Sequence, residues 1–177
     1  MPPGTEAIAD ETLLALLSYW RSKRGARRFP SRADIDPAEI PALLPHIILT
    51  DVMPDGRYRY RLTGTSVDTN ATVALAGRYI EEAFTERTYI DYINSLFDHV
   101  ARGQIIYTEG EFRVDREVSV RRVKRLGFPL SSDGARVDVV LVGQVYQFGN
   151  IARGLHDRQD HRTWQETHRC LIDPATL

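Results

Sequence analysis

The stretch IILTDVMPDGRYRYRLTGT, residues 47–65, holds two runs of strand-forming residues separated by the triplet Pro-Asp-Gly at 54–56. Proline, aspartate and glycine together favour a tight reversal of the chain. The flanking runs are rich in β-branched and aromatic residues, which suit a pleated sheet. We therefore predict an antiparallel hairpin with strands at residues 47–53 and 57–65.

The second of these strands combines arginine with apolar residues in strict alternation. Side chains point to opposite faces along a strand, so one face carries Tyr58, Tyr60 and Leu62 and the arginines face the other way. We interpret the arginines as the outer face of a half-buried sheet, with Arg61 paired to Asp51 across the hairpin. An anion-binding or partner-binding face is the alternative, and a nucleic-acid ribbon is disfavoured.

Composition narrows the possible functions. The 177 residues include 23 basic and 24 acidic side chains, so the net charge of −1 argues against a nucleic-acid binder driven by bulk charge. The single Cys170 excludes an intramolecular disulfide and a cysteine-based zinc site. The strongly apolar stretch at 137–145 is too short to insert in a membrane, and the acidic N-terminus is unlike a signal peptide. We expect one cytoplasmic domain.

Two segments show the apolar spacing of amphipathic helices. The first spans residues 6–24 and is followed by Gly25, which is a plausible helix stop. Its apolar stripe consists of Leu13, Leu16, Leu17 and Trp20. The second spans residues 86–102 and is followed by Gly103. Its stripe consists of Tyr89, Ile90, Ile93, Leu96, Phe97 and Val100.

Three more strands are predicted after the second helix, at residues 105–114, 118–128 and 137–148, with a turn at 129–134 between the last two. The order is then helix, two strands, short helices, long helix and three strands. This order is typical of an α+β domain with a five-stranded antiparallel sheet.

The chain divides into three parts on this basis. Residues 1–46 form a helical leader, residues 47–148 the core, and residues 149–177 a polar tail. We expect the tail either to dock through Trp164 and Leu171 or to remain in solvent.

Several stretches occur in the order found in one PAS domain subfamily of short proteins that is common in alphaproteobacteria. They are the leader helix with Trp20, PSRADIDPAEI with LLPHIILTDV, YRYRLTGT, AGRYIEE, and FPLSSDG with VDVVLVG. The chain resembles this subfamily over residues 13–148. The resemblance implies a five-stranded antiparallel sheet with helices on one face and space for a small ligand between the sheet and the long helix.

The resemblance also implies a function. A sensory or regulatory module is expected, one that binds a small molecule, a signalling protein, or both, and that has no output domain of its own. The leader helix of such domains commonly mediates homodimers or passes a signal. Two alternatives remain open: an interaction adaptor with a fully packed interior, and a small enzyme on a related α+β fold.

The predicted inner faces of the strands and of the long helix define a set of candidate ligand-binding residues. They are Tyr60, Leu62, Ile90, Ile93, Phe97, Phe112, Val139 and Leu141. The sequence identifies no cofactor for this site. It also shows no Gly-rich phosphate loop and no serine with a partnering histidine, so we do not expect an enzyme.

Histidines and a basic run suggest further sites. His99 lies on the long helix, where haem-binding PAS domains carry their axial ligand, but its expected direction favours a solvated histidine. His156, His161 and His168 lack a standard metal-ligand spacing, so no metal site is predicted. The run RRVKR at 121–125 resembles an anion-binding patch, and alternation along a strand requires a buried partner for one of its basic residues.

Overall fold

The computed structural model describes residues 5–71, 73–115, 118–148 and 163–177. The chain forms a single antiparallel six-stranded sheet in the order β2-β1-β5-β4-β3-β6. The strands are β1 Ile47–Val52, β2 Tyr58–Thr63, β3 Ile105–Asp115, β4 Val118–Leu130, β5 Val139–Phe148 and β6 Thr163–Ile172. The α+β class is confirmed, and the sheet has one strand more than predicted.

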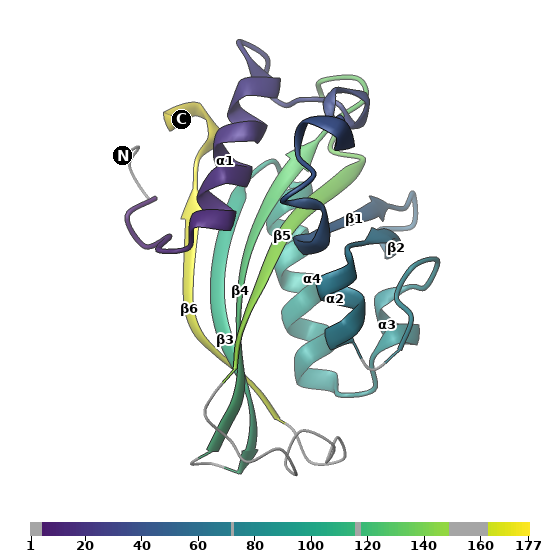
Figure 1. Ribbon diagram of the computed structural model, residues 1–177. Coiled ribbons are helices and arrows are strands. Elements are labelled where there is room, and N and C mark those ends of the chain that lie inside the picture. Colours follow the sequence, from purple (N-terminus) through teal and green to yellow (C-terminus); the bar gives the residue numbers. More distant parts are fainter. Residues whose placement is uncertain (1–4, 72, 116–117, 149–162) are drawn as a thin grey trace.

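Helices cover both faces of this sheet (Figure 1). The α-helices are α1 Glu11–Arg24, α2 Thr65–Asn70, α3 Ile80–Ala83 and α4 Arg87–Ala101. Short 3-10 turns occupy Arg32–Asp34, Pro37–Glu39, Leu44–His46 and Pro174–Thr176. α1 packs on β4 and β5 from one side, and α4 packs on β3, β4 and β5 with α2 and α3 beside it on the other. The sheet therefore separates two hydrophobic cores.

Helix α1 begins at Glu11, five residues later than predicted, because Asp10 caps it by accepting a hydrogen bond from the Leu13 backbone N–H at 3.1 Å. All residues of the predicted apolar stripe are buried against the rest of the same chain. Trp20 is 0 % exposed, stacks on Phe128 at 5.8 Å, and donates its indole N–H to the Pro129 carbonyl at 3.0 Å. The stripe that suggested a homodimer contact thus packs on its own sheet, and a dimer through α1 would have to use its polar face.

A glycine in β5 allows α1 to lie directly against the sheet. A Cβ at Gly143 would come within 2.7 Å of Leu16 Cδ2 and 2.9 Å of Leu13 Cδ2. Cβ atoms do not approach a neighbour this closely, so an alanine at this position would force both leucine side chains to shift. The α1 face is therefore packed to contact at the centre of the sheet.

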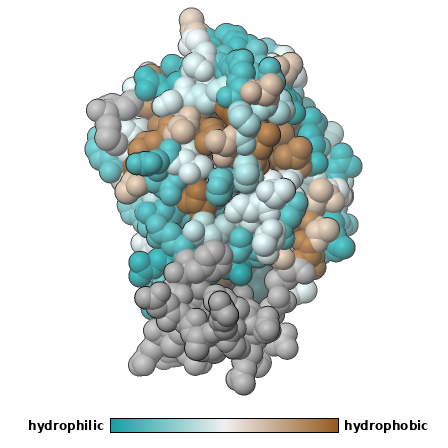
Figure 2. All heavy atoms as spheres, in the orientation of Figure 1, coloured by the Kyte–Doolittle hydropathy of each residue, from teal (hydrophilic) through white to brown (hydrophobic). Residues whose placement is uncertain are grey.

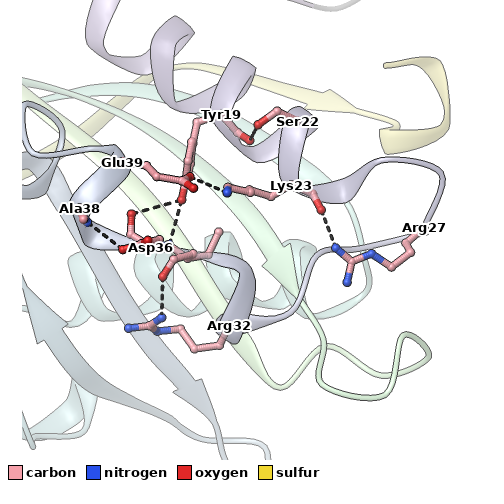
Figure 3. A network of polar contacts seen from close by, with 9 residues as sticks. Tyr19, Ser22, Lys23, Arg27, Arg32, Asp36, Ala38 and Glu39 are labelled. Carbon is pink, nitrogen blue, oxygen red and sulfur yellow. Dashed lines mark hydrogen bonds and ion pairs between the residues drawn. The ribbon is translucent and has the colours of Figure 1, made fainter.

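Polar contacts fix the other side of α1, as Figure 3 shows. The Tyr19 hydroxyl accepts a hydrogen bond from the Asp36 N–H at 2.9 Å and donates to the Asp36 carbonyl at 3.3 Å. The Lys23 ammonium lies 2.5 Å from a carboxylate oxygen of Glu39. These contacts join α1 to the 3-10 turn Pro37–Glu39, so the leader is part of the folded unit.

The sixth strand comes from the segment predicted as a polar tail. β6 pairs antiparallel with β3, and Trp164 is 6 % exposed beside Gly110, whose missing Cβ leaves room for the indole ring. Docking through Trp164 is confirmed, whereas Leu171 is 42 % exposed. β6 is a half-buried edge strand with mostly polar side chains, which explains why its sequence resembles a loop. Within the tail, His156 and His161 lie outside the described residues.

A bulge in the β1–β2 hairpin changes the predicted face of one residue. Leu49 pairs with Leu62 and Thr50 pairs with Tyr60, so Arg61 is an extra residue in β2. Arg61 and Leu62 consequently both point outward, and Leu62 is 41 % exposed. The predicted ion pair is confirmed: Arg61 Nε lies 2.6 Å from a carboxylate oxygen of Asp51.

The surface seen in Figure 2 is mainly hydrophilic, and its hydrophobic residues form patches separated by polar ones. In the described ranges, no helix has the length and apolar character needed to cross a membrane.

Candidate functional site

A cavity of about 410 Å³ lies between the sheet and the helices α2–α4. β1, β2, β3, β4 and β5 form its floor, α4 forms one wall, and the segments after α2 and α3 form the rest. Its lining consists of Ile48, Tyr60, Val67, Asn70, Ala71, Val73, Leu75, Ala83, Phe84, Thr85, Glu86, Tyr89, Ile93, Phe97, Phe112, Arg121, Arg125, Val142, Gln144 and Tyr146.

The structure divides the predicted site residues into two groups. Those that line the cavity are Tyr60, Ile93, Phe97 and Phe112. Those that do not are Leu62, Ile90, Val139 and Leu141. Ile90 packs at the border of the same hydrophobic core, and Leu62 faces outward because of the bulge.

The last two of these residues belong to the opposite core. Val139 and Leu141 pack on the α1 side of β5, and Val140 and Val142 face α4. Both faces of β5 are buried, so its apolar run has no alternation from which the inward face could be predicted. The prediction that Val139 and Leu141 face the same cavity as Tyr60 is therefore wrong, because their side chains lie on the opposite face of the sheet.

The sequence did not identify the most unusual group in the cavity, the guanidinium of Arg125, which is 2 % exposed. Arg125 donates from Nε to Gln144 Oε1 at 2.5 Å, from Nη1 to the Tyr92 hydroxyl at 3.1 Å, and from Nη2 to the Tyr89 hydroxyl at 2.7 Å. All three acceptors are neutral groups. The basic run at 121–125 does contain a residue that needs buried partners, as its alternation predicted.

Aromatic rings surround the same guanidinium. Its central carbon lies 5.1 Å from the ring centre of Trp164, 5.4 Å from that of Tyr92 and 5.7 Å from that of Tyr89. Cation–π attraction therefore supplements the hydrogen bonds. In the part of the chain that the structure describes, no carboxylate forms an ion pair with Arg125.

The tyrosines of the cavity are held in their protonated form. Burial raises the pKa of Tyr60, of Tyr89 and of Tyr146 above the ordinary value for a phenol. They are hydroxyl groups at neutral pH and cannot neutralise Arg125. The Tyr60 hydroxyl, moreover, has no hydrogen-bond partner among the described residues.

The other members of the basic run separate according to strand alternation. Arg121 lines the cavity, where its Nη1 donates to the Asn70 carbonyl at the end of α2 at 2.7 Å. Arg122 lies on the other face of β4, is exposed, and has its Nε 3.6 Å from a carboxylate oxygen of Glu111. The run is therefore not one continuous anion patch, and its cavity side is carried by Arg121 and Arg125.

The haem alternative rests on His99, whereas the metal alternative involves His156 and His161, which lie outside the described residues. His99 does not line the cavity, and its Nδ1 lies 2.8 Å from Gln104 Oε1 at the end of α4. Among the described residues, no cluster of three or more His, Cys, Asp or Glu side chains could hold a metal ion.

The chemistry available in the cavity is that of recognition. Its described lining contains no serine, cysteine or histidine, and its one carboxylate, Glu86, accepts the backbone N–H groups of Thr88 at 2.9 Å and Tyr89 at 2.7 Å as the cap of α4. Hydrogen-bond donors and apolar rings dominate what remains. Such a lining can hold and orient a guest.

A comparison with protein families matches residues 8–141 to the PAS domain. No curated protein and no solved structure matches the chain. The match extends from the residues just before α1 into β5 and so includes the leader, the hairpin, α4 and most of the sheet. The chain therefore belongs to the PAS domain family, whose members are sensory or regulatory modules.

Proposed function

We propose that this PAS domain is a cytoplasmic sensory or regulatory module that binds a small molecule in the cavity between the sheet and α4. The observation that carries the proposal is the cavity itself, at about 410 Å³. Sites for small ligands typically measure roughly 300–1,000 Å³ and combine an apolar lining with a few polar groups. The lining here has that character, since aromatic and aliphatic side chains surround Arg125, Gln144 and Tyr60.

The alternatives are less well supported by the same observation. An adaptor with a fully packed interior would have no such cavity. A small enzyme would need convergent catalytic groups, and the described lining includes no serine, cysteine or histidine.

A signalling protein is proposed as the partner that reads the occupied state. The cavity is bordered by short segments, residues 71, 73–76 and 83–86, whose packing a guest would change. A homodimer remains a further proposal, with the polar face of α1 as its contact, since Leu16 and Trp20 are already buried.

The test is a fluorescence titration with N-phenyl-1-naphthylamine, an uncharged apolar dye that brightens in apolar surroundings. Ala71 lines the cavity from the end of α2, so Ala71→Phe should fill part of the space and weaken binding of the dye. Ala135, in the exposed turn between β4 and β5, provides the matched control Ala135→Phe. Thermal melts followed by circular dichroism verify that both variants are folded.

We expect saturable binding by the natural chain and by Ala135→Phe, and weaker binding by Ala71→Phe. No saturable binding to the natural chain, or equal binding by all three proteins, would contradict a ligand cavity. Mass spectrometry under native and denaturing conditions then shows whether the purified protein retains a natural guest.

A further inference from the structure

We propose that the ligand of this cavity is an amphipathic monocarboxylate, with its carboxylate at Arg125 and its apolar body among the aromatic side chains. This inference rests on the proposed function and specifies the chemical class of the guest. It follows from an imbalance between hydrogen-bond donors and acceptors in the cavity.

The first part of the imbalance is the charge of Arg125. A guanidinium buried to this extent is normally paired with an acid. Here its three hydrogen bonds end on neutral oxygens of Gln144, Tyr92 and Tyr89. A guanidinium has five N–H groups, so Arg125 retains unused donors. An anion bound beside it would supply the missing counter-charge.

The second part is the direction of the hydroxyl groups. Tyr89 accepts from Arg125, and no described residue accepts its own proton. The Tyr60 hydroxyl lines the cavity without any hydrogen-bond partner in the described chain. Tyr92 differs, because its hydroxyl lies 2.7 Å from Thr108 Oγ1 and is therefore satisfied within the protein. Tyr60, Tyr89 and Arg125 together offer donors and need an acceptor.

The lining also fixes the rest of the guest. Phe84, Phe97, Phe112 and Ile93 surround the remaining space, which an inorganic anion could not fill. A planar carboxylate matches the fork of N–H groups that a guanidinium presents. Glu86 does not take this role, since backbone N–H groups at the start of α4 already bind its carboxylate.

The experiment displaces N-phenyl-1-naphthylamine with two probes of equal size, 4-phenylbutyrate and 4-phenylbutanamide, and with inorganic phosphate. Charge-assisted hydrogen bonds predict that the carboxylate binds at least about tenfold more tightly than the amide. Phosphate, which lacks an apolar body, should displace little dye.

Variants assign the preference to a residue. Arg125→Met keeps an unbranched, flexible side chain and removes the guanidinium with its charge, so it should bind the dye and lose the preference for the carboxylate. Arg125→Lys should retain part of the preference. Arg122→Met is the matched control, because Arg122 lies on the opposite face of β4 and should leave the ratio unchanged.

The outcomes separate the two proposals. Dye binding with equal displacement by the carboxylate and the amide, or with none by either, would overturn the monocarboxylate and leave the cavity intact. Failure of the dye to bind would overturn the proposed function itself. If Arg125→Met does not fold, Tyr60→Phe replaces it, and an unchanged carboxylate-to-amide ratio in both Tyr60→Phe and Arg125→Lys would likewise overturn the inference.

Discussion

The two faces of one sheet differ in how they are packed. On the α1 face, aliphatic side chains and Trp20 pack closely on the sheet, and Leu13 and Leu16 occupy the space that a side chain at Gly143 would need. On the α4 face, aromatic rings surround a cavity of about 410 Å³ and a buried Arg125. Consecutive residues of β5 serve both, since Val142 lines the cavity and Gly143 contacts α1. One tightly packed layer can thus hold the sheet while the other keeps a space for a guest.

The largest effect should come from emptying the packed face. Trp20→Ala removes a ring that is 0 % exposed, its stacking on Phe128 and its hydrogen bond to Pro129. The expected loss is about 3–5 kcal/mol of unfolding free energy, measured by urea denaturation. Phe84, which lines the cavity and is only partly buried, gives the contrast. Phe84→Ala should cost clearly less, and equal losses at the two positions would show that the faces are not packed differently.

A sharper comparison adds one carbon to each of two neighbouring residues of β5. Gly143→Ala places a methyl group within 2.7 Å of Leu16 Cδ2, whereas Val142→Ile extends toward the cavity. Overpacking of this kind typically costs about 1–3 kcal/mol, and the higher strand propensity of alanine offsets part of it.

Val142→Ile should change the unfolding free energy by less than about 1 kcal/mol, because space is present beside it. It should also weaken dye binding by occupying that space. A larger destabilisation at Val142 than at Gly143 would reverse the comparison. Urea denaturation of both variants, measured in parallel, decides between these results.

The same contrast explains which features the sequence could predict. The helices and the first hairpin were predicted well, because one-sided burial leaves a clear period in α4 and a Pro-Asp-Gly turn marks the hairpin. The inward face of β5 could not be predicted, since helices cover both of its sides. The predicted inward direction of Leu62 was wrong because β2 contains a bulge, which no residue pattern in the sequence indicates.

The candidate site was predicted in part. Its aromatic members, such as Tyr60 and Phe97, follow from the amphipathic pattern, and the structure places both on the cavity. Arg125 was missed because a basic residue in a basic run looks like a solvent-exposed one. Alternation within the run was the available signal, as it puts Arg125 and Val123 on the same buried side. Trp164 also contacts the Arg125 guanidinium, and it was missed because the polar sequence of β6 does not resemble a strand.

The smallest effect should come from the arginine face of β2, which tests whether a cation far from the cavity matters. Asp51, whose side chain is 12 % exposed, contacts Arg61 Nε at 2.6 Å and Arg59 Nη2 at 3.4 Å. Arg61 is about half exposed, so Arg61→Ala should cost less than about 1 kcal/mol of unfolding free energy, and still less at high salt. Arg59 remains to compensate Asp51, and dye binding should be unchanged because Arg61 does not line the cavity. A loss of more than about 1 kcal/mol would contradict the small effect expected of an exposed ion pair. Altered binding of the dye would show that a cation outside the cavity contributes to ligand binding. Arg61→Ala should also leave the ratio of carboxylate to amide binding unchanged, as expected if Arg125 is the cation that binds the carboxylate.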